Sequence, residues 1–251
     1  MHPVASEGFE RSVEAYRRSR PSYPPQAVAW LVEALSIGPG KTVVDVGAGT
    51  GKLTALLLPT GARLLAVEPL ATMRAALAQD LPTVEALAGM AEALPVDDAS
   101  ADAIIVGQAF HWFDPDRTLR EFRRALRPAG RLGVIWNEMD TSVDWVRRFN
   151  EIIALPRTGT PHPSAARSAD LGRHFSAAVH AQFRHVHQHD RESLLDRVAS
   201  MSFVAVLPEQ ERAGVFERVT ALIDSHPDIR GRDTFELPYL TEAFWAERRG
   251  G

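Results

Sequence analysis

The amino-acid sequence predicts an α/β fold, with a mostly parallel sheet covered by helices on both faces. Between Lys41 and Asn137, short β-branched apolar runs alternate with longer helical patterns, which is typical of βαβ units. The runs are almost continuously apolar, as strands buried on both faces of a parallel sheet have to be. These runs are TVVDV (42–46), RLLAVE (63–68), TVEALA (83–88), ADAIIVG (101–107) and RLGVIWN (131–137).

Two helices in this region have recognisable ends. One is expected to begin at Pro24 and to end at Gly38, because proline suits a first turn and glycine suits the position after the last. A second is expected to run from the N-cap Asp114 to the helix-breaking Pro128. The face opposite its apolar stripe is expected to be solvated, and it carries Arg117, Arg120, Arg123, Arg124 and Arg127.

The alternation stops after Asn137. The expected elements are a helix over 143–155, a polar loop over 156–168, a strand over 181–189, helices over 192–200 and 209–225, and a terminal strand within 234–248. In the first of these strands His185, His187 and His189 share one face, and three imidazoles are able to hold a metal ion. Neither a cysteine nor a carboxylate at fixed spacing accompanies them, so the pattern favours an exposed polar face and no metal.

Composition narrows the chemistry further. A chain of 251 residues with 45% hydrophobic and 24% charged residues suits one large folded domain. Without cysteine it has no disulfide, catalytic thiol or thiolate zinc site. Its 28 basic and 32 acidic residues leave a net charge of −4, which gives no overall attraction for nucleic acid. No apolar run approaches the roughly 20 residues that cross a bilayer, and no secretory signal is recognisable, so a cytoplasmic protein is expected.

The most informative segment is VVDVGAGTGKLT (43–54), a glycine-rich turn between a strand and a helix. Glycine allows a ligand to approach the backbone closely, and the helix N-terminus offers unpaired N–H groups. A phosphate-binding P-loop requires Gly and Ser or Thr where Val46 and Leu53 stand. A dinucleotide fingerprint requires its third glycine where Lys52 stands. Both interpretations are therefore weakened, and the remaining pattern is Asp-x-Gly-x-Gly-x-Gly.

Acidic residues end the first two expected strands, Asp45 in the first and Glu68 in the second. This arrangement resembles the S-adenosylmethionine (SAM) site of class I methyltransferases, which have a Rossmann-like, seven-stranded, mostly parallel sheet. The resemblance implies that the loop backbone lies against the methionine part of SAM, and that Glu68 accepts hydrogen bonds from the two ribose hydroxyls. A carboxylate suits that role, because two adjacent hydroxyls offer two donors.

Further segments carry the resemblance to the adenosine part of the site. Pro69 and Met73 are similar to residues that pack around adenosine, whereas Met90 stands where relatives often have an aspartate for the adenine amino group. Ala91 or Glu92 is expected to take over that contact. The cofactor-binding residues implied by the resemblance are Asp45, Gly47, Ala48, Gly49, Thr50, Gly51, Glu68, Pro69, Met73, Met90, Ala91, Glu92, Gln108 and Ala109.

Two longer stretches, 9–24 and 107–140, are similar to methyltransferases of type 11, in particular to the trans-aconitate methyltransferase-like subfamily that acts on small molecules. This resemblance implies that the N-terminal segment folds over the site, with Arg20 able to bind a carboxylate. Ligands of open α/β sheets bind beyond the carboxyl ends of the strands, where His111 is a candidate general base. The predicted substrate-binding residues are Tyr16, Arg20, Tyr23, Phe110, His111 and Trp112.

The sequence thus predicts a single domain over 1–251. It comprises an N-terminal helical cap (1–39), a SAM-binding core (40–140) and a C-terminal substrate-side half (141–251) that completes the sheet. The predicted activity is SAM-dependent, metal-independent methyl transfer to a small molecule, with a carboxylate as one candidate acceptor and no nucleic-acid or membrane partner. Two alternatives stay open: a non-catalytic SAM-binding protein and a nicotinamide-dependent oxidoreductase. The sequence specifies neither the acceptor, nor the methylated atom, nor the oligomeric state.

Overall fold

A seven-stranded sheet runs through the computed structural model, which describes residues 21–154 and 173–250. The strand order is β3-β2-β1-β4-β5-β7-β6. The first five strands are parallel, and β7 is antiparallel to both of its neighbours, which confirms the predicted mostly parallel sheet. The strands are β1 (Thr42–Val46), β2 (Arg63–Val67), β3 (Glu85–Leu87), β4 (Ala101–Gly107), β5 (Leu126–Met139), β6 (Val179–His189) and β7 (Phe235–Glu247).

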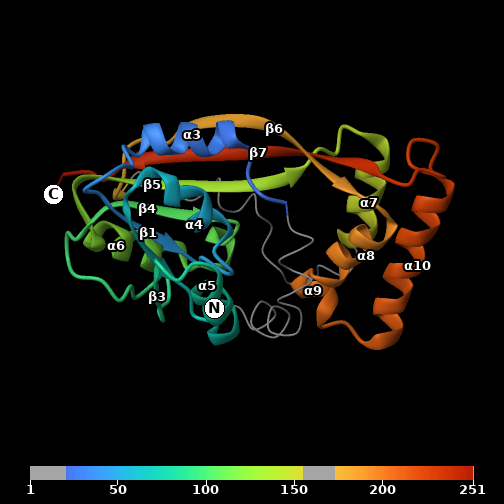
Figure 1. Cartoon of the computed structure of the whole chain (residues 1–251), viewed down its shortest axis with the longest axis horizontal. Helices are drawn as coiled ribbons and strands as arrows, with labels where there is room; N and C mark the ends of the chain where they lie inside the picture. The colour runs from blue at the N-terminus through green and yellow to red at the C-terminus, as the bar shows by residue number, and fades with distance from the viewer. Residues whose placement is uncertain (1–20, 155–172, 251) are drawn as a thin grey trace.

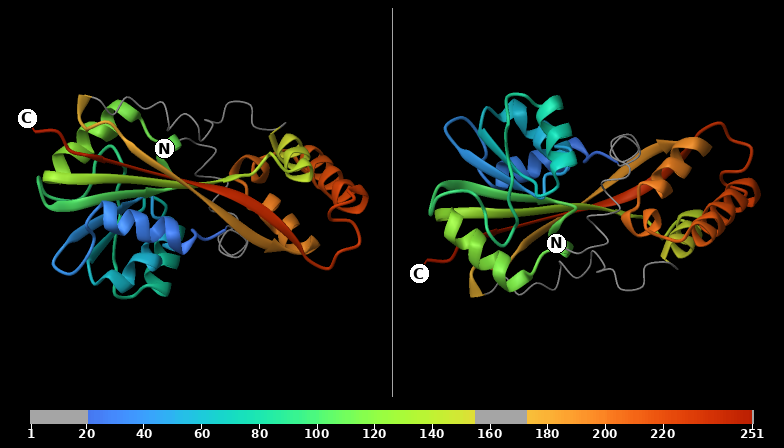
Figure 2. Two further views of the ribbon diagram at one scale, coloured as in Figure 1. Left: turned by 90° about the horizontal axis from the view of Figure 1, so that it is seen from above. Right: turned by 90° about the horizontal axis from the view of Figure 1, so that it is seen from below.

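Helices cover both faces of the parallel part of the sheet (Figure 2). One face carries α3 (Pro25–Ala34), α4 (Lys52–Leu57) and α5 (Ala71–Asp80), and the other carries α6 (Pro115–Ala125). Neighbouring residues of β1 enter opposite cores: Val43 packs with α3 and Val44 packs with α6. Because both side chains are buried, the strand reads as continuously apolar, which is why its sequence was recognisable. Two short 3₁₀ turns, η1 (Leu58–Thr60) and η2 (Phe110–Trp112), follow α4 and β4.

The long strands β6 and β7 extend beyond the parallel strands to a lobe of helices, seen at the right of Figure 1. This helical lobe consists of α7 (Asp144–Ala154), α8 (Arg191–Ala199), α9 (Ser202–Ala205) and α10 (Glu209–Ser225). It has its own apolar core, in which Trp145 and Leu194 pack with Tyr239 of β7. The lobe therefore holds α8 against the end of the sheet.

The end of α6 and the start of β5 differ from the expectation. The helix stops at Ala125 rather than at Pro128, and Leu126 already pairs with Ala101 of β4. Leu126 is extended and fully buried, so burial of its side chain in the sheet outweighs another turn of helix. The arginine face of α6 is not wholly solvated either, because half-buried Arg124 donates hydrogen bonds to Glu121 and to backbone carbonyls.

The histidine face of β6 is also not the exposed surface that the sequence favoured. His185 and His187 are half-buried and His189 is buried, because α8 packs over this face and its Ser193 lies 3.2 Å from His189 Nδ1. His187 Nδ1 lies 2.9 Å from His189 Nε2. Within the described part of the chain, no group of three or more His, Cys, Asp or Glu side chains is arranged to hold a metal ion.

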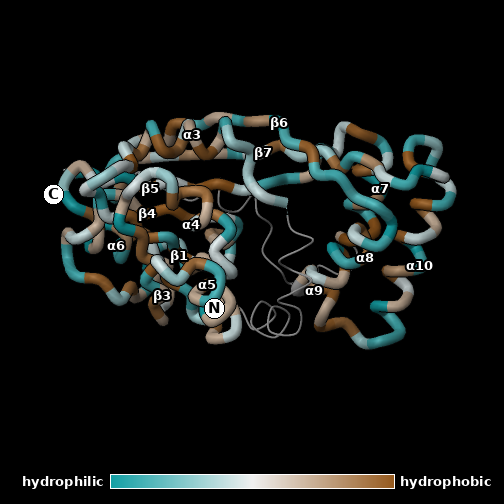
Figure 3. Tube along the Cα trace, viewed as in Figure 1, coloured by the Kyte–Doolittle hydropathy of each residue, from teal (hydrophilic) through white to brown (hydrophobic). Residues whose placement is uncertain are grey.

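Hydropathy along the chain follows this architecture. Figure 3 shows hydrophobic residues concentrated on β1, β4 and β5, whereas β6 turns hydrophilic as it approaches α8. Over 21–154 and 173–250, no helix combines the length and the apolar character that crossing a membrane requires. The predicted polar loop at 156–168 and the residues Tyr16 and Arg20 lie outside the described residues.

Candidate functional site

The glycine-rich turn lies at the carboxyl end of β1, as predicted, and its backbone geometry requires glycine. Gly47 has φ +69°, and a Cβ atom on it would lie 2.7 Å from the Cβ of Ala109 and 3.3 Å from the ring of Phe113. Gly51 has φ +83° and is the N-cap of α4. The loop thus passes directly beneath the segment that follows β4, and this approach leaves no room for a side chain.

Gly47→Ala should therefore be destabilising. Alanine at a positive φ costs about 1–2 kcal/mol, and relief of the contact with Ala109 should cost about 1–3 kcal/mol more. Urea denaturation monitored by circular dichroism should show a free energy of unfolding lowered by about 2–5 kcal/mol. Gly38→Ala is the control, because no described atom lies within 4 Å of the added Cβ. Equal stability of the two variants would contradict the close approach at Gly47.

Glu68 links this loop to the end of β2. The residue is 5% exposed. One oxygen accepts a hydrogen bond from the backbone N–H of Gly49 at 2.9 Å, and the other accepts from that of Leu70 at 2.9 Å. Burial raises the pKa of Glu68, and these two hydrogen bonds oppose the rise. Each carboxylate oxygen has a further lone pair, so Glu68 can also accept hydrogen bonds from a ligand.

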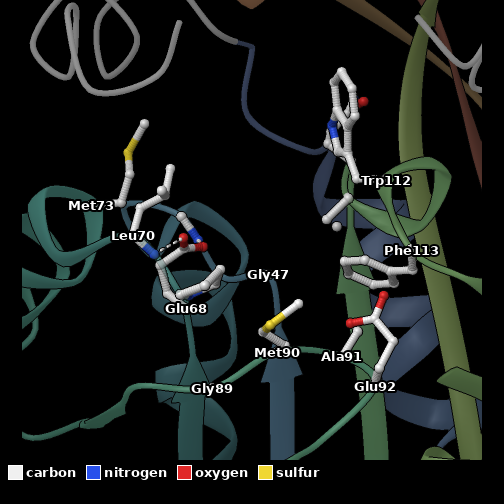
Figure 4. Close-up of a pocket in the computed structure, with 15 residues that line it drawn as sticks. Gly47, Glu68, Leu70, Met73, Gly89, Met90, Ala91, Glu92, Trp112 and Phe113 are labelled. Carbon is white, nitrogen blue, oxygen red and sulfur yellow. Dashed lines mark hydrogen bonds between the residues drawn. The ribbon is translucent and has the colours of Figure 1, made fainter. Parts of the chain in front are cut away.

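A first pocket, with about 730 Å³ of empty space including open solvent, lies beside Glu68. Figure 4 shows Glu68, Leu70 and Met73 on one side and Trp112 and Phe113 on the opposite side. Of the residues predicted from sequence, those that line it are Gly47, Gly49, Glu68, Pro69, Met73, Met90, Ala91, Glu92, Gln108, Ala109 and Trp112. The structure thus brings most of the predicted cofactor set together around one cavity.

A second pocket of about 640 Å³ shares Gly47, Gly49, Gly107 and Gln108 with the first, so the two pockets adjoin at the loop. Its lining includes the predicted residues Asp45, Ala48, Thr50 and Tyr23. It also includes residues that sequence reasoning missed, namely Pro21, Lys52, Leu53, Asn137 and Arg197.

Asp45 is the acidic residue in the described lining of the second pocket. It is 3% exposed, and its Oδ2 accepts a hydrogen bond of 2.6 Å from the hydroxyl of Thr54. Its Oδ1 is buried without a hydrogen-bond partner among the described residues. Burial raises the pKa of Asp45 to about 7, the bond from Thr54 opposes the rise, and the negative charge of Glu68 adds to it. The side chain therefore carries a polar atom that a ligand can satisfy.

Some predicted residues lie elsewhere. Phe110 is 4% exposed within the core that faces α6, and it packs against Phe113, which lines the pocket wall in its place. His111 is half-buried in η2 with its ring 4.8 Å from that of Trp112, and it is not among the described residues lining either pocket. Gly51 is the N-cap of α4 and is not among the described residues lining either pocket.

Residues missed in the first pocket are Leu70, Gly89, Gly107 and Phe113. Leu70 and Phe113 directly follow the predicted residues Pro69 and Trp112, so adjacency in the sequence is a signal that points to them. Arg197 has no such signal, because it is far in the sequence from the other lining residues and reaches the pocket only through the packing of α8.

Comparisons with known proteins agree with this geometry. Residues 44–134 match the methyltransferase domain family. The chain is 41% identical over 236 residues to an uncharacterized methyltransferase of Mycobacterium tuberculosis, covering 94% of this chain and 93% of that protein.

Two solved structures share the fold. The YcgJ protein of Bacillus subtilis has a TM-score of 0.60 at 16% identity, covering 90% of this chain and 99% of the other. Phosphoethanolamine N-methyltransferase 2 of Haemonchus contortus, solved with phosphomonomethylethanolamine and S-adenosylhomocysteine, has a TM-score of 0.59 at 14% identity. That match covers 100% of this chain and 61% of the nematode protein. With its sheet order, its glycine-rich loop and a relative of 41% identity over nearly its full length, the chain belongs to the class I SAM-dependent methyltransferases.

Proposed function

We propose that this protein transfers a methyl group from SAM to a small-molecule acceptor, with a carboxylate as one candidate for the accepting group. The observation that carries the proposal is Glu68, a buried carboxylate that ties the glycine-rich loop to β2 and faces an open pocket. A phosphate-containing dinucleotide is disfavoured at the loop by Lys52, which replaces the third glycine of the dinucleotide fingerprint. The nicotinamide-dependent alternative is correspondingly weaker.

The residues present fit SAM. Glu68 retains lone pairs for two ribose hydroxyls, and Leu70, Met73 and Met90 offer apolar surface for an adenine ring. Gly49 leaves the loop backbone accessible, because no described atom lies within 4 Å of a Cβ added there. The similar fold of the Haemonchus contortus enzyme, which was solved with S-adenosylhomocysteine, supports the same cofactor class here. SAM supplies a methyl group already activated on a sulfonium.

The protein's own contribution is alignment and exclusion of water, and proximity of this kind is worth up to about 7–11 kcal/mol. Trp112 and Phe113 form the aromatic wall of the first pocket, and an indole face attracts a positive charge. A general base is needed only when the acceptor loses a proton during the reaction. His111, which adjoins Trp112, is our candidate for that role.

His111→Ala should leave affinity for S-adenosylhomocysteine within about twofold of the wild type, because His111 lies outside the described linings of both pockets. Turnover of a protonated acceptor should fall by at least about 100-fold, the lower end of what a general base contributes. A carboxylate acceptor needs no base, so its turnover should be unaffected. Transfer of tritium from labelled SAM to a panel of acids, amines and phenols measures both. His174→Ala is the matched control, and loss of cofactor affinity in His111→Ala would contradict the assigned role.

The first test of the proposal is heat stabilisation of the protein by S-adenosylhomocysteine. Absence of any response would remove the proposal, and fluorescence titration with NADH then tests the oxidoreductase alternative. A non-catalytic SAM-binding protein would bind S-adenosylhomocysteine but transfer no label to any acceptor of the panel.

We further propose that residues 141–251 form the substrate side of a single domain, with 1–39 as its cap and 40–140 as its cofactor-binding core. Support comes from α8, which contributes Arg197 to the second pocket. Membership of the trans-aconitate methyltransferase-like subfamily and a cytoplasmic location are proposals that rest on the sequence, as is the lack of a nucleic-acid partner.

A further inference from the structure

Arg197 on α8 is a buried cation at the edge of the second pocket. The residue is 5% exposed and lines that pocket together with Lys52 and Asn137. Its guanidinium carbon lies 5.4 Å from the centre of the Tyr239 ring. Its Nε and Nη1 are buried without a hydrogen-bond partner anywhere in residues 21–154 and 173–250. A buried guanidinium is costly unless a counter-charge satisfies it.

Among the described residues, the side chains around Arg197 do not supply that counter-charge. Burial lowers the pKa of His187, and the positive charges of Arg197 and Lys52 lower it further. Burial lowers the pKa of His189 to about 3, with added repulsion from His187 and Arg197. Both imidazoles therefore stay neutral at physiological pH. The acidic residue in the described lining, Asp45, already bonds to Thr54, and its own pKa is raised to about 7.

We propose, building on the methyltransferase function proposed above, that Arg197 binds an oxyanion group of the methyl acceptor in the second pocket. A guanidinium presents five N–H donors in a planar fork that matches a carboxylate or a phosphate. The free Nε and Nη1 are donors available for such a group, and Asn137 and Tyr23 place further polar atoms in the same lining. Arg197 is thus a binding residue that selects anionic acceptors.

The methionine carboxylate of the cofactor is the alternative oxyanion that Arg197 could bind. The acceptor is favoured because the glycine-rich loop, Glu68 and Trp112 all fall within the family match at 44–134, and Arg197 does not. Arg197 also comes from the helical lobe, which packs around a separate core and is seen at the right of Figure 1. A residue supplied by that lobe is suited to distinguish this protein's acceptor rather than to bind the shared cofactor.

The test compares the wild type with Arg197→Met and with the control Arg184→Met, which removes an exposed arginine from the opposite face of β6. Calorimetry and thermal melting measure binding of S-adenosylhomocysteine and of 5′-methylthioadenosine, which lacks the carboxylate. Benzoate, succinate and phenyl phosphate are then added at constant ionic strength, with and without saturating S-adenosylhomocysteine. Because Arg197→Met removes a buried unpaired charge, its melting temperature without ligand should equal or exceed that of the wild type.

The expected result is that all three proteins bind both nucleosides within about twofold of one another. At least one of the oxyanions should stabilise the wild type and Arg184→Met, and should bind Arg197→Met about tenfold or more weakly, as expected for the loss of one charge-assisted hydrogen bond. Weaker binding of S-adenosylhomocysteine but not of 5′-methylthioadenosine by Arg197→Met would assign the guanidinium to the cofactor and overturn the proposal.

Oxyanion binding that is absent, or equal in Arg197→Met and the wild type, would also overturn it. Failure of the wild type to bind S-adenosylhomocysteine would instead refute the proposed function. The oxyanion measurements made without that ligand would still report on the anion site.

Discussion

Glu68→Ala is expected to abolish measurable binding of S-adenosylhomocysteine. The substitution removes the acceptor for two ribose hydroxyls, and hydrogen bonds to a charged group contribute about 1.5–3 kcal/mol each. It also removes the acceptor of the Gly49 and Leu70 N–H groups, which position the glycine-rich loop against β2. The combined loss of about 3–6 kcal/mol corresponds to an affinity at least about 100-fold lower.

Isothermal titration calorimetry of the folded variant measures this loss, with circular dichroism to establish that the sheet is intact. Glu85→Ala is the matched control, because Glu85 on β3 is exposed and pairs with Arg63, which is also exposed. Glu68→Gln refines the result, since an amide keeps one oxygen acceptor but places N–H donors opposite those of the loop. Cofactor affinity of Glu68→Ala close to that of the wild type would exclude Glu68 from the cofactor site.

Asp45→Asn is expected to make the ligand-free protein more stable above pH 7. The pKa of Asp45 is raised from 3.8 to about 7 in the folded protein, chiefly because the carboxyl is buried. The stability that this group contributes is fully present below pH 3.8 and is lost as the pH rises to about 7, because only the unfolded chain ionises readily over that range. The difference corresponds to about 4 kcal/mol.

Asparagine does not titrate, and its side-chain oxygen can still accept the hydrogen bond from the hydroxyl of Thr54. The free energy of unfolding of Asp45→Asn relative to the wild type should thus increase between pH 4 and pH 8 by up to about 4 kcal/mol, and level off above the folded-state pKa. Chemical denaturation across this pH range measures it, with the exposed Asp233→Asn as control for the loss of one negative charge. A stability difference that does not change with pH would show that Asp45 is ionised throughout in the folded protein.

Much of the fold follows from local sequence. Val43 and Val44 are buried on opposite faces of the sheet. Because both faces require apolar side chains, β1 is recognisable in the sequence as a run of adjacent apolar residues. Asp114 accepts a hydrogen bond from the N–H of Arg117 at the start of α6, as its N-cap position predicted. The prediction for the other end of α6 was wrong. Leu126 is buried in the sheet because β5 pairs with β4, and helix-ending signals in the local sequence do not report this pairing.

The candidate site divides in the same way. Gly47 and Glu68 were recognisable because a turn that passes close to another segment requires glycine, and because the acidic residue stands at the end of a strand. The sequence did not reveal that Phe113, rather than Phe110, lines the pocket wall. The η2 turn places the ring of Phe110 in the core and leaves the ring of Phe113 at the cavity.

By itself the sequence determined the α/β class, the mostly parallel sheet and the glycine-rich loop with its acidic neighbours, because strand periodicity and backbone conformation are encoded by residues close together in the chain. Only the tertiary structure decided that the histidine face of β6 is covered, that Phe113 lines the first pocket, and that Arg197 reaches the second. The outcomes for β6 and Arg197 depend on the helical lobe packing α8 against β6 and β7, whereas the outcome for Phe113 depends on the way η2 packs against the core. Burial and charge at that contact arise from segments far apart in the sequence, so no local pattern specifies them.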